Sequence, residues 1–237
     1  MGRGTYCAGS PHEPWRPPVT KDLSDKIIRA LRRRYPDAAT DLKYRDIYQL
    51  AVAVVLSAQT TDRQVNSVTG ELFAEYPDFA SLAGARSIRV REIIRSTGFY
   101  RTKAKHIIGL AKAVNAHHGG RLPGSREELV RLPGIGRKSA NVILSVGFGI
   151  PALAVDTHVA RLANRLAYVS TKNPVEVERA LTSFIPERYW TLAHLLLIRH
   201  GRAVCRARSP LCGVCPVNRY CESVDKIRRT PQSPADR

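Results

Sequence analysis

The 237-residue chain carries 38 lysine and arginine residues against 20 aspartate and glutamate residues, a formal net charge of +18. This excess implies a polyanionic partner, and the length suffices to bury a core in one large domain or two small ones. No apolar stretch reaches the roughly 18 to 20 residues of a membrane-spanning helix, and the N-terminus lacks the apolar segment of a signal peptide. We therefore expect neither a membrane protein nor a secreted one.

Apolar residues recur with helical spacing along most of the chain. Residues 47–58 are apolar on nearly every side and should be buried all round, whereas residues 22–35 have one apolar face. Asp62 is placed to cap the helix that follows it. Because no strand alternation or internal repeat occurs, we predict an all-α fold with helices over residues 22–35, 47–58, 62–76, 88–95, 103–115, 138–148, 157–166, 175–184 and 189–200.

The two ends of the chain differ from the rest. Residues 1–20 are rich in proline and glycine and have no periodicity, so we interpret them as a flexible tail that contains the isolated Cys7. Residues 227–237 are interpreted as a second flexible tail.

A break at residues 96–98, Ser-Thr-Gly, separates two of the predicted helices. We interpret residues 99–103 after it as a glycine-hinged loop that combines two aromatic side chains with three groups able to contact phosphate, Arg101, Thr102 and Lys103. An exposed apolar residue on such a loop is suited to fill the hole that a base leaves when it is extruded from duplex DNA. The alternative is that both aromatic residues belong to the core.

A tight turn is predicted between two helices at Leu132, Pro133, Gly134, Ile135 and Gly136. Ser125 and Glu128 predict a capping box at the start of the helix before it. The two glycines let the backbone approach a partner closely, and the next helix points its N-terminal N–H groups the same way. The turn is therefore a candidate site for a nucleic-acid phosphate.

Two residues near this turn are candidates for chemistry. Lys138 lies in the first turn of the second helix, where the positive end of the helix dipole disfavours an ammonium, and a neutral lysine amine is a nucleophile. Asp156 follows the apolar run 153–155, which can hold a lone carboxylate at the mouth of a cleft. The alternative for Lys138 is an ordinary solvated side chain.

Four of the five cysteines are close together in the sequence, at Cys205, Cys212, Cys215 and Cys221. Such crowding argues against a disulfide framework and for a metal site. Zinc sites of four cysteines usually consist of two short knuckles, and this set has only one two-residue gap, at 212–215. Ligand chemistry alone leaves zinc and an iron–sulfur cluster open.

The turn at 132–136, Lys138, the Val-Asp-Thr-His run at 155–158 and the four cysteines together resemble the helix–hairpin–helix and Gly-Pro/Asp signature of base-excision DNA glycosylases. The endonuclease III family is the most similar branch, over about residues 22 to 225. The resemblance selects a [4Fe–4S] cluster held by the four cysteines over zinc. It implies two helical lobes that flank a DNA-binding cleft, with a six-helix barrel domain at 40–150 and an iron–sulfur cluster domain made of 21–39 and 151–226.

The resemblance also implies the reaction. Lys138 would attack the sugar C1′ to expel a damaged base and form a Schiff base, with Asp156 as its acid–base partner, and β-elimination would cut the strand 3′ to the abasic site. The implied substrate is double-stranded DNA with oxidised pyrimidines or abasic sites. The implied protein is a monomer in the bacterial cytoplasm, associated with the nucleoid.

The resemblance assigns DNA contacts as well. Gln59 matches a residue that enters the gap left by a flipped base, and Phe99 occupies the wedge position. The cluster loop would present Arg202, Arg206 and Arg208 to the DNA backbone. The full set of implied DNA contacts is Gln59, Phe99, Leu132, Pro133, Gly134, Ile135, Gly136, Arg137 and His158. The alternative for His158 is that it only stabilises the start of its helix.

Two other functions compete with this one. A monofunctional, adenine-type glycosylase shares the hairpin, Asp156 and the cluster, but lacks a lysine at position 138. A non-catalytic helix–hairpin–helix protein would use Lys138 only as a phosphate contact. In that second case Lys138→Ala would weaken binding slightly, and there would be no strand cleavage to lose.

Overall fold

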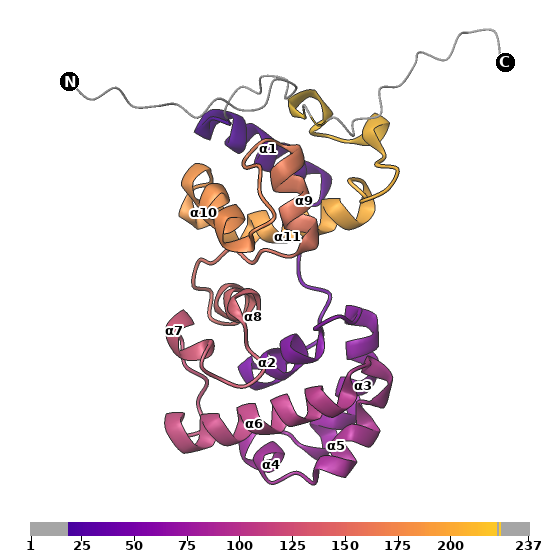
Figure 1. Ribbon diagram of the computed structural model, residues 1–237, viewed down its shortest axis with the longest axis vertical. Coiled ribbons are helices and arrows are strands. Elements are labelled where there is room, and N and C mark those ends of the chain that lie inside the picture. The colour runs from indigo at the N-terminus through magenta and orange to yellow at the C-terminus, as the bar shows by residue number, and fades with distance from the viewer. Residues whose placement is uncertain (1–18, 222, 224–237) are drawn as a thin grey trace, which may run out of the picture.

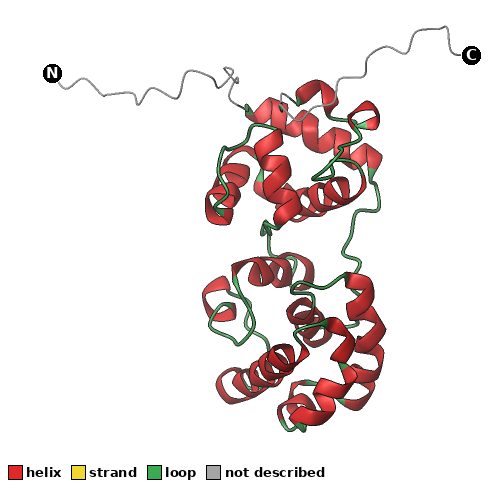
Figure 2. Ribbon diagram, turned by 45° about the vertical axis from the view of Figure 1, so that its right-hand side comes forward, coloured by secondary structure: helices red, strands yellow, loops and turns green. Residues whose placement is uncertain are grey.

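The computed structural model describes residues 19–221 and 223. Cys7 and the two predicted tails, apart from residues 19 and 20, lie outside the described residues. Within the described part every regular element is helical, and Figure 2 shows helices joined by loops. The prediction of an all-α fold is confirmed. No helix of this part is long and apolar enough to cross a membrane.

The helices form two groups, one above the other in Figure 1. The lower group contains α2 (Ile47–Leu56), α3 (Asp62–Glu75), α4 (Phe79–Ala83), α5 (Ser87–Ile93), α6 (Tyr100–His118), α7 (Arg126–Leu129) and α8 (Arg137–Val142). The upper group contains α1 (Lys21–Arg34), α9 (Thr157–Arg165), α10 (Pro174–Phe184) and α11 (Trp190–Ala203). Short helical turns complete them, at Arg95–Thr97, Ile143–Gly147, Glu187–Tyr189, Cys212–Val214 and Asn218–Tyr220.

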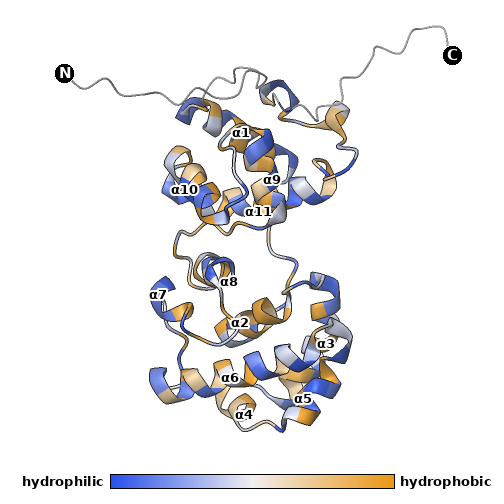
Figure 3. Cartoon of the chain, in the orientation of Figure 1, coloured by the Kyte–Doolittle hydropathy of each residue, from blue (hydrophilic) through white to orange (hydrophobic). Residues whose placement is uncertain are grey.

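Each group has its own hydrophobic core. The lower core contains buried residues from Leu42 to Ala152, and the upper core joins Val19–Tyr35 to Leu153 and later residues. In the lower core α2 is buried on nearly all sides, as predicted, and it is mostly orange in Figure 3, whereas α1 shows mixed colours. The chain thus passes between the two groups twice. The separation of the two hydrophobic cores supports the proposed two-domain division.

The start of α3 differs from the prediction. Its N-cap is Thr61, whose backbone is extended and whose hydroxyl oxygen accepts a hydrogen bond from the Gln64 N–H at 3.2 Å. Asp62 already belongs to the first turn of the helix, so the prediction that it caps α3 is wrong. Its carboxylate instead faces Arg202 of α11, at 3.0 Å.

The start of α6 is also earlier than predicted. Gly98 and Phe99 both have a positive φ, of 66° and 45°, which interrupts the right-handed helical backbone before residue 100. The helix therefore begins at Tyr100, and residues 100–103 are not a loop. Lys103 then points into the lobe, where it is only 4% exposed, so the prediction that it contacts phosphate is wrong.

Candidate active site

The structure brings Lys138 and Asp156 to the wall of one cavity of about 80 Å³ between the two lobes. Lys138 comes from the first turn of α8 in the lower lobe, and Asp156 comes from the start of α9 in the upper lobe. The Lys138 residue is exposed, and Asp156 is half-buried. An amine and a carboxylate from different lobes therefore share one water-accessible space.

The position of Asp156 follows from its local sequence. Leu153 and Val155 belong to the upper core and anchor the segment before α9. Asp156 is the N-cap of that helix, and its Oδ1 accepts hydrogen bonds from the backbone N–H groups of His158 and Val159, both at 2.8 Å. One carboxylate oxygen is thus committed to the helix start, and this fixes the orientation of the group.

The hairpin before Lys138 is anchored by its apolar residues and open at its second glycine. Leu132 and Ile135 are buried in the lower core, and Pro133 packs near Gly109 of α6. Gly134 has a φ of 80°, which favours glycine, and Gly136 has no atom within 4 Å of the place where a Cβ would lie. The hairpin therefore presents bare backbone at Gly136, at the start of α8, whereas Gly134 is packed against side chains of the lower lobe.

The predicted capping box before the hairpin forms only in part. Ser125 caps α7 and accepts from the Glu128 N–H at 3.3 Å. Its hydroxyl also donates to the Glu128 carboxylate at 2.6 Å. Because that carboxylate bonds the hydroxyl, the cap differs from a capping box, where it would accept from the backbone N–H of Ser125.

Arg137 joins the two lobes. Its Nε and Nη2 donate to the two carboxylate oxygens of Glu178, on α10, at 2.8 and 2.9 Å. Glu178 is buried, and its carboxylate raises the pKa of Arg137. No local sequence signal marks Glu178, because it lies 41 residues from Arg137 among other surface-type residues of α10. The predicted contact of Arg137 with DNA stays a prediction.

His194 is a second residue that the sequence analysis missed. It lies on α11, is 1% exposed and borders the cavity that Lys138 and Asp156 share. Burial lowers the pKa of His194 to about 4, so its imidazole is neutral near pH 7. The only signal in the sequence was a histidine inside the apolar stretch 189–200.

His158 is held by the protein beside the same site. Its Nδ1 lies 3.0 Å from Nη2 of Arg161, which also donates to the Gly201 carbonyl at 2.9 Å. Because a guanidinium only donates, Nδ1 accepts, and the neutral ring carries its proton on Nε2. Burial lowers the pKa of His158. His158 also borders a wide groove of about 830 Å³ next to the cavity.

Arg202 forms an ion-pair network across the lobes. Its Nη1 donates to Oδ2 of Asp41 and to Oδ2 of Asp62, each at 3.0 Å. Arg199 adds a contact with Asp41 at 3.3 Å. Arg202, Arg206 and Arg208 are all exposed, but a contact of Arg202 with the DNA backbone has to compete with two carboxylates.

Gln59 and Phe99 lie on two loops of the lower lobe. Both residues are exposed, and both have left-handed backbone, with φ of 52° and 45°. Neither residue lines the cavity that contains Lys138. Thr60, next to Gln59, lines the wide groove. The two predicted insertion residues thus lie outside the cavity that Lys138 and Asp156 share.

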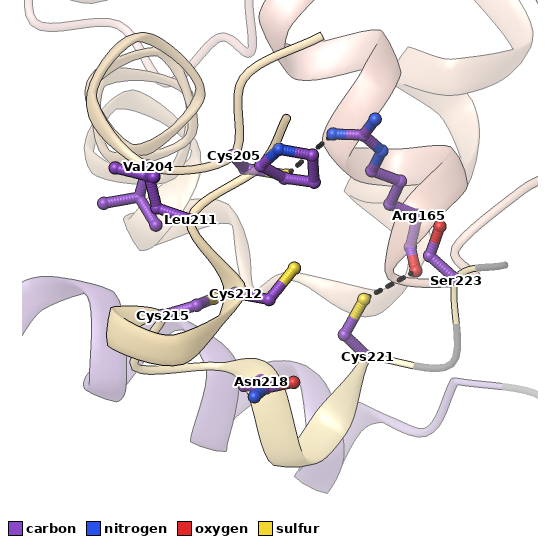
Figure 4. A pocket seen from close by; sticks show the side chains of 10 residues that line it. Arg165, Val204, Cys205, Leu211, Cys212, Cys215, Asn218, Cys221 and Ser223 are labelled. Atoms are coloured by element: carbon purple, nitrogen blue, oxygen red, sulfur yellow. Dashed lines mark hydrogen bonds between the residues drawn. The ribbon is translucent and has the colours of Figure 1, made fainter. Parts of the chain in front are cut away.

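The four clustered cysteines surround one small cavity, shown in Figure 4. A single zinc ion would bring four sulfur atoms to within roughly 3.8 Å of one another, given a Zn–S distance of about 2.3 Å. No group of three donors among residues 19–221 and 223 is arranged to hold one metal ion. Four thiols around a shared space fit a cluster, whose own atoms separate its ligands, better than they fit zinc.

The surroundings of this cavity suit a negatively charged cluster. Arg165 of α9 donates from Nη1 to Cys205 Sγ at 3.3 Å and to the Arg206 carbonyl at 2.7 Å. Arg161 donates from Nε to the Cys205 carbonyl at 3.0 Å. Two arginines of α9, the helix that Asp156 caps, therefore hold the loop on which the cysteines lie.

Comparisons with known proteins agree with this site. Residues 52–187 match the HhH-GPD superfamily of base excision DNA repair proteins, and residues 205–221 match the iron–sulfur binding domain of endonuclease III. The fold and the site thus define an enzyme of base excision DNA repair with a helix–hairpin–helix motif. Endonuclease III of Synechocystis sp. is 45% identical over 204 residues, which cover 86% of this chain and 93% of that protein. Endonuclease III of Escherichia coli is 38% identical over 202 residues, which cover 85% and 96%.

Solved structures give the same result. A trapped covalent intermediate of an endonuclease III with DNA, in an estranged-adenine complex, superposes with a TM-score of 0.82 at 40% identity, and covers 86% of this chain and 96% of that one. A non-covalent endonuclease III–DNA complex superposes equally well. The chain belongs to the endonuclease III family.

This membership settles several predictions. The predicted enzyme class, a bifunctional DNA glycosylase and AP lyase of base excision repair, is confirmed. The [4Fe–4S] cluster is confirmed as the cofactor, and DNA as the partner.

Proposed function

We propose that Lys138 is the nucleophile and Asp156 its acid–base partner in the removal of oxidised pyrimidines from duplex DNA. The observation that carries this proposal is their placement on one cavity from opposite lobes. A flipped nucleotide in this cavity would have an amine and a carboxylate within reach of its sugar. The covalent protein–DNA intermediate trapped for a relative of 40% identity supports the same chemistry here.

The proposed reaction proceeds in two stages. The Lys138 Nζ lone pair forms a bond to C1′ while the bond from C1′ to the base nitrogen breaks, and the base leaves with that electron pair. Asp156 accepts the proton that the new C1′–N bond releases, and its charge stabilises the positive charge that builds on the sugar. The nitrogen lone pair then forms the C=N bond of the Schiff base as the C1′–O4′ bond breaks, and Asp156 returns the proton to O4′. Loss of a C2′ proton then expels the 3′ phosphate, which cuts the strand 3′ to the lesion.

The remaining residues bind and orient the substrate. The backbone at Gly136 is open to a phosphate near Lys138, and the exposed residues Gln59 and Phe99 are placed on loops that can fill the gap left by a flipped base. The four cysteines hold the [4Fe–4S] cluster, which when bound cross-links the loop that follows α11. We assign Arg206 and Arg208 of that loop to the DNA backbone.

Further parts of the proposal concern the substrate and the cell. Oxidised pyrimidines and abasic sites in double-stranded DNA are the proposed lesions. The net charge of +18 suits a duplex partner and gives binding that weakens steeply with salt. We propose a monomer, because one chain contributes both Lys138 and Asp156, and a bacterial, nucleoid-associated location.

The test is borohydride trapping on duplexes that carry thymine glycol or an abasic site. Lys138→Ala should abolish the covalent adduct, while Lys112→Ala, an exposed lysine on α6, should leave it unchanged. Free-base release by the unaltered protein without any adduct would identify a monofunctional glycosylase instead. Tight DNA binding by the unaltered protein without adduct or base release would identify a non-catalytic binding protein.

The role of Asp156 needs a separate variant, because the residue is also a helix cap. Asparagine caps helices about as well as aspartate, so Asp156→Asn keeps the hydrogen bonds to α9 and removes only the charge. We expect it to fold normally and to slow trapping by about 100-fold, within the range typical of general acid–base catalysis. Full activity in Asp156→Asn would show that the residue acts only as a cap.

A further inference from the structure

Two exposed residues of the lower lobe have a positive φ, a backbone conformation that residues other than glycine rarely adopt. Gln59 has a φ of 52° and Phe99 a φ of 45°. Such residues persist only where the surrounding structure holds them, and they occur preferentially at functional sites. Contacts close to Gln59 and Phe99 must therefore hold their backbone in this conformation.

A buried lysine joins the two loops beside these residues. Lys103, 4% exposed, donates from Nζ to the Thr60 hydroxyl at 2.6 Å and to the Thr97 carbonyl at 2.8 Å. The Thr60 hydroxyl in turn donates to the same Thr97 carbonyl. Thr60 follows Gln59 in the chain, and Thr97 precedes Phe99 by two residues. One nitrogen atom thus fixes the neighbours of both strained residues.

This arrangement is unusual for a lysine. No carboxylate of the described residues forms an ion pair with Lys103, and burial lowers its pKa. A buried ammonium costs much solvation free energy unless acceptors satisfy its donors, and here the acceptors belong to the two loops. A second contact, from Gln64 Nε2 to Ser96 Oγ at 2.7 Å, joins the same parts of the chain at the surface.

We propose that Lys103 is a positioning residue that holds Gln59 and Phe99 as one rigid DNA-inserting unit and so sets the discrimination between damaged and undamaged duplex. This inference rests on the proposed insertion of Gln59 and Phe99 into DNA. Rigid loops lose little conformational entropy when they enter the duplex. Their fixed spacing therefore favours a site where a base is already unpaired or easily flipped. Lys103 itself touches no reacting atom.

The test compares Lys103→Met with Lys105→Met. Lys105 is an exposed lysine two residues further along α6. The affinity ratio between duplexes with and without an abasic site measures discrimination, and 2-aminopurine opposite the abasic site reports insertion by fluorescence. Since hydrogen bonds from a charged donor are strong, Lys103→Met should lower the ratio by about tenfold and weaken the fluorescence change. Lys105→Met should weaken both affinities equally and leave their ratio unchanged.

A substrate that needs no insertion into a duplex distinguishes loss of positioning from a general structural defect of the variant. Borohydride trapping on a single-stranded abasic oligonucleotide should proceed at the normal rate in Lys103→Met, while trapping on duplex slows. Equal loss on both substrates, or an unchanged affinity ratio in the folded variant, overturns the proposal. If Lys103→Met does not fold, Thr60→Val removes one acceptor of the ammonium, and the same two outcomes apply to it.

Failure of the insertion proposal itself would look different. Gln59→Ala and Phe99→Ala should each reduce the 2-aminopurine signal. If neither does, the proposed insertion is wrong whatever Lys103→Met shows. If both do and Lys103→Met leaves the signal and the ratio unchanged, only the role of Lys103 is refuted.

Discussion

The hairpin that carries Lys138 requires a glycine at position 134. The backbone there has a φ of 80°, and a Cβ would lie 2.8 Å from Cβ of His106 and 3.0 Å from Cγ1 of Val55. A left-handed non-glycine residue costs roughly 1 to 2 kcal/mol, and overpacking adds roughly 1 to 3 kcal/mol. Gly134→Ala should therefore lower the free energy of unfolding by about 2 to 5 kcal/mol, because α6 and α2 cannot easily move apart.

Gly136→Ala is the matched control in the same turn. Its φ is −93°, and no atom lies within 4 Å of the added Cβ, so its stability should change by less than about 1 kcal/mol. The added methyl group would stand on the open backbone near Lys138, so Gly136→Ala should instead weaken binding to abasic duplex. Urea unfolding and fluorescence anisotropy measure the two effects. If Gly134→Ala were as stable as the unaltered protein, or Gly136→Ala equally destabilised, the close packing argued for the hairpin would be refuted.

Three further predictions concern the lobes, the cavity and the cluster loop. Glu178→Gln should destabilise the protein by about 1 to 2 kcal/mol in urea unfolding, because the bidentate bonds to the half-exposed Arg137 lose their charge; the exposed Glu187→Gln should have no effect. His194 has a pKa of about 4 when folded and about 6.5 when unfolded, so the unfolded chain takes up the proton first as the pH falls, and stability is lost between these values. His194→Gln should remove about 2 kcal/mol of that pH-dependent loss between pH 7 and pH 5, measured as the difference in unfolding free energy at the two pH values, and an unchanged difference would contradict the burial argument. Cys212→Ser should abolish the visible absorbance of the cluster and weaken DNA binding, whereas Cys7→Ser should retain both.

Most of the helices could be predicted from the sequence because their signals are local. Apolar spacing places α2 and α11, and it needs only neighbours within two turns of helix. The hairpin at 132–136 and the four-cysteine segment are equally short, so a match over a few residues identifies each. The predicted start of a helix was wrong where a single residue decided it, as with Thr61 before α3 and Gly98 before α6.

The contacts that complete the site depended on the tertiary structure. Lys103 resembles any solvated lysine in the sequence, and only the packing of α6 against the loop at Thr60, 43 residues away, buries it. Glu178 and His194 likewise acquire their roles from the approach of the upper lobe to α8 and to the cavity. The hairpin with Lys138, the run at 155–158 and the four cysteines determined the class of protein through their resemblance to a known family, since each motif is a property of a short stretch. Burial and pairing of charged groups depend on which distant elements meet, and the folded chain alone decided them.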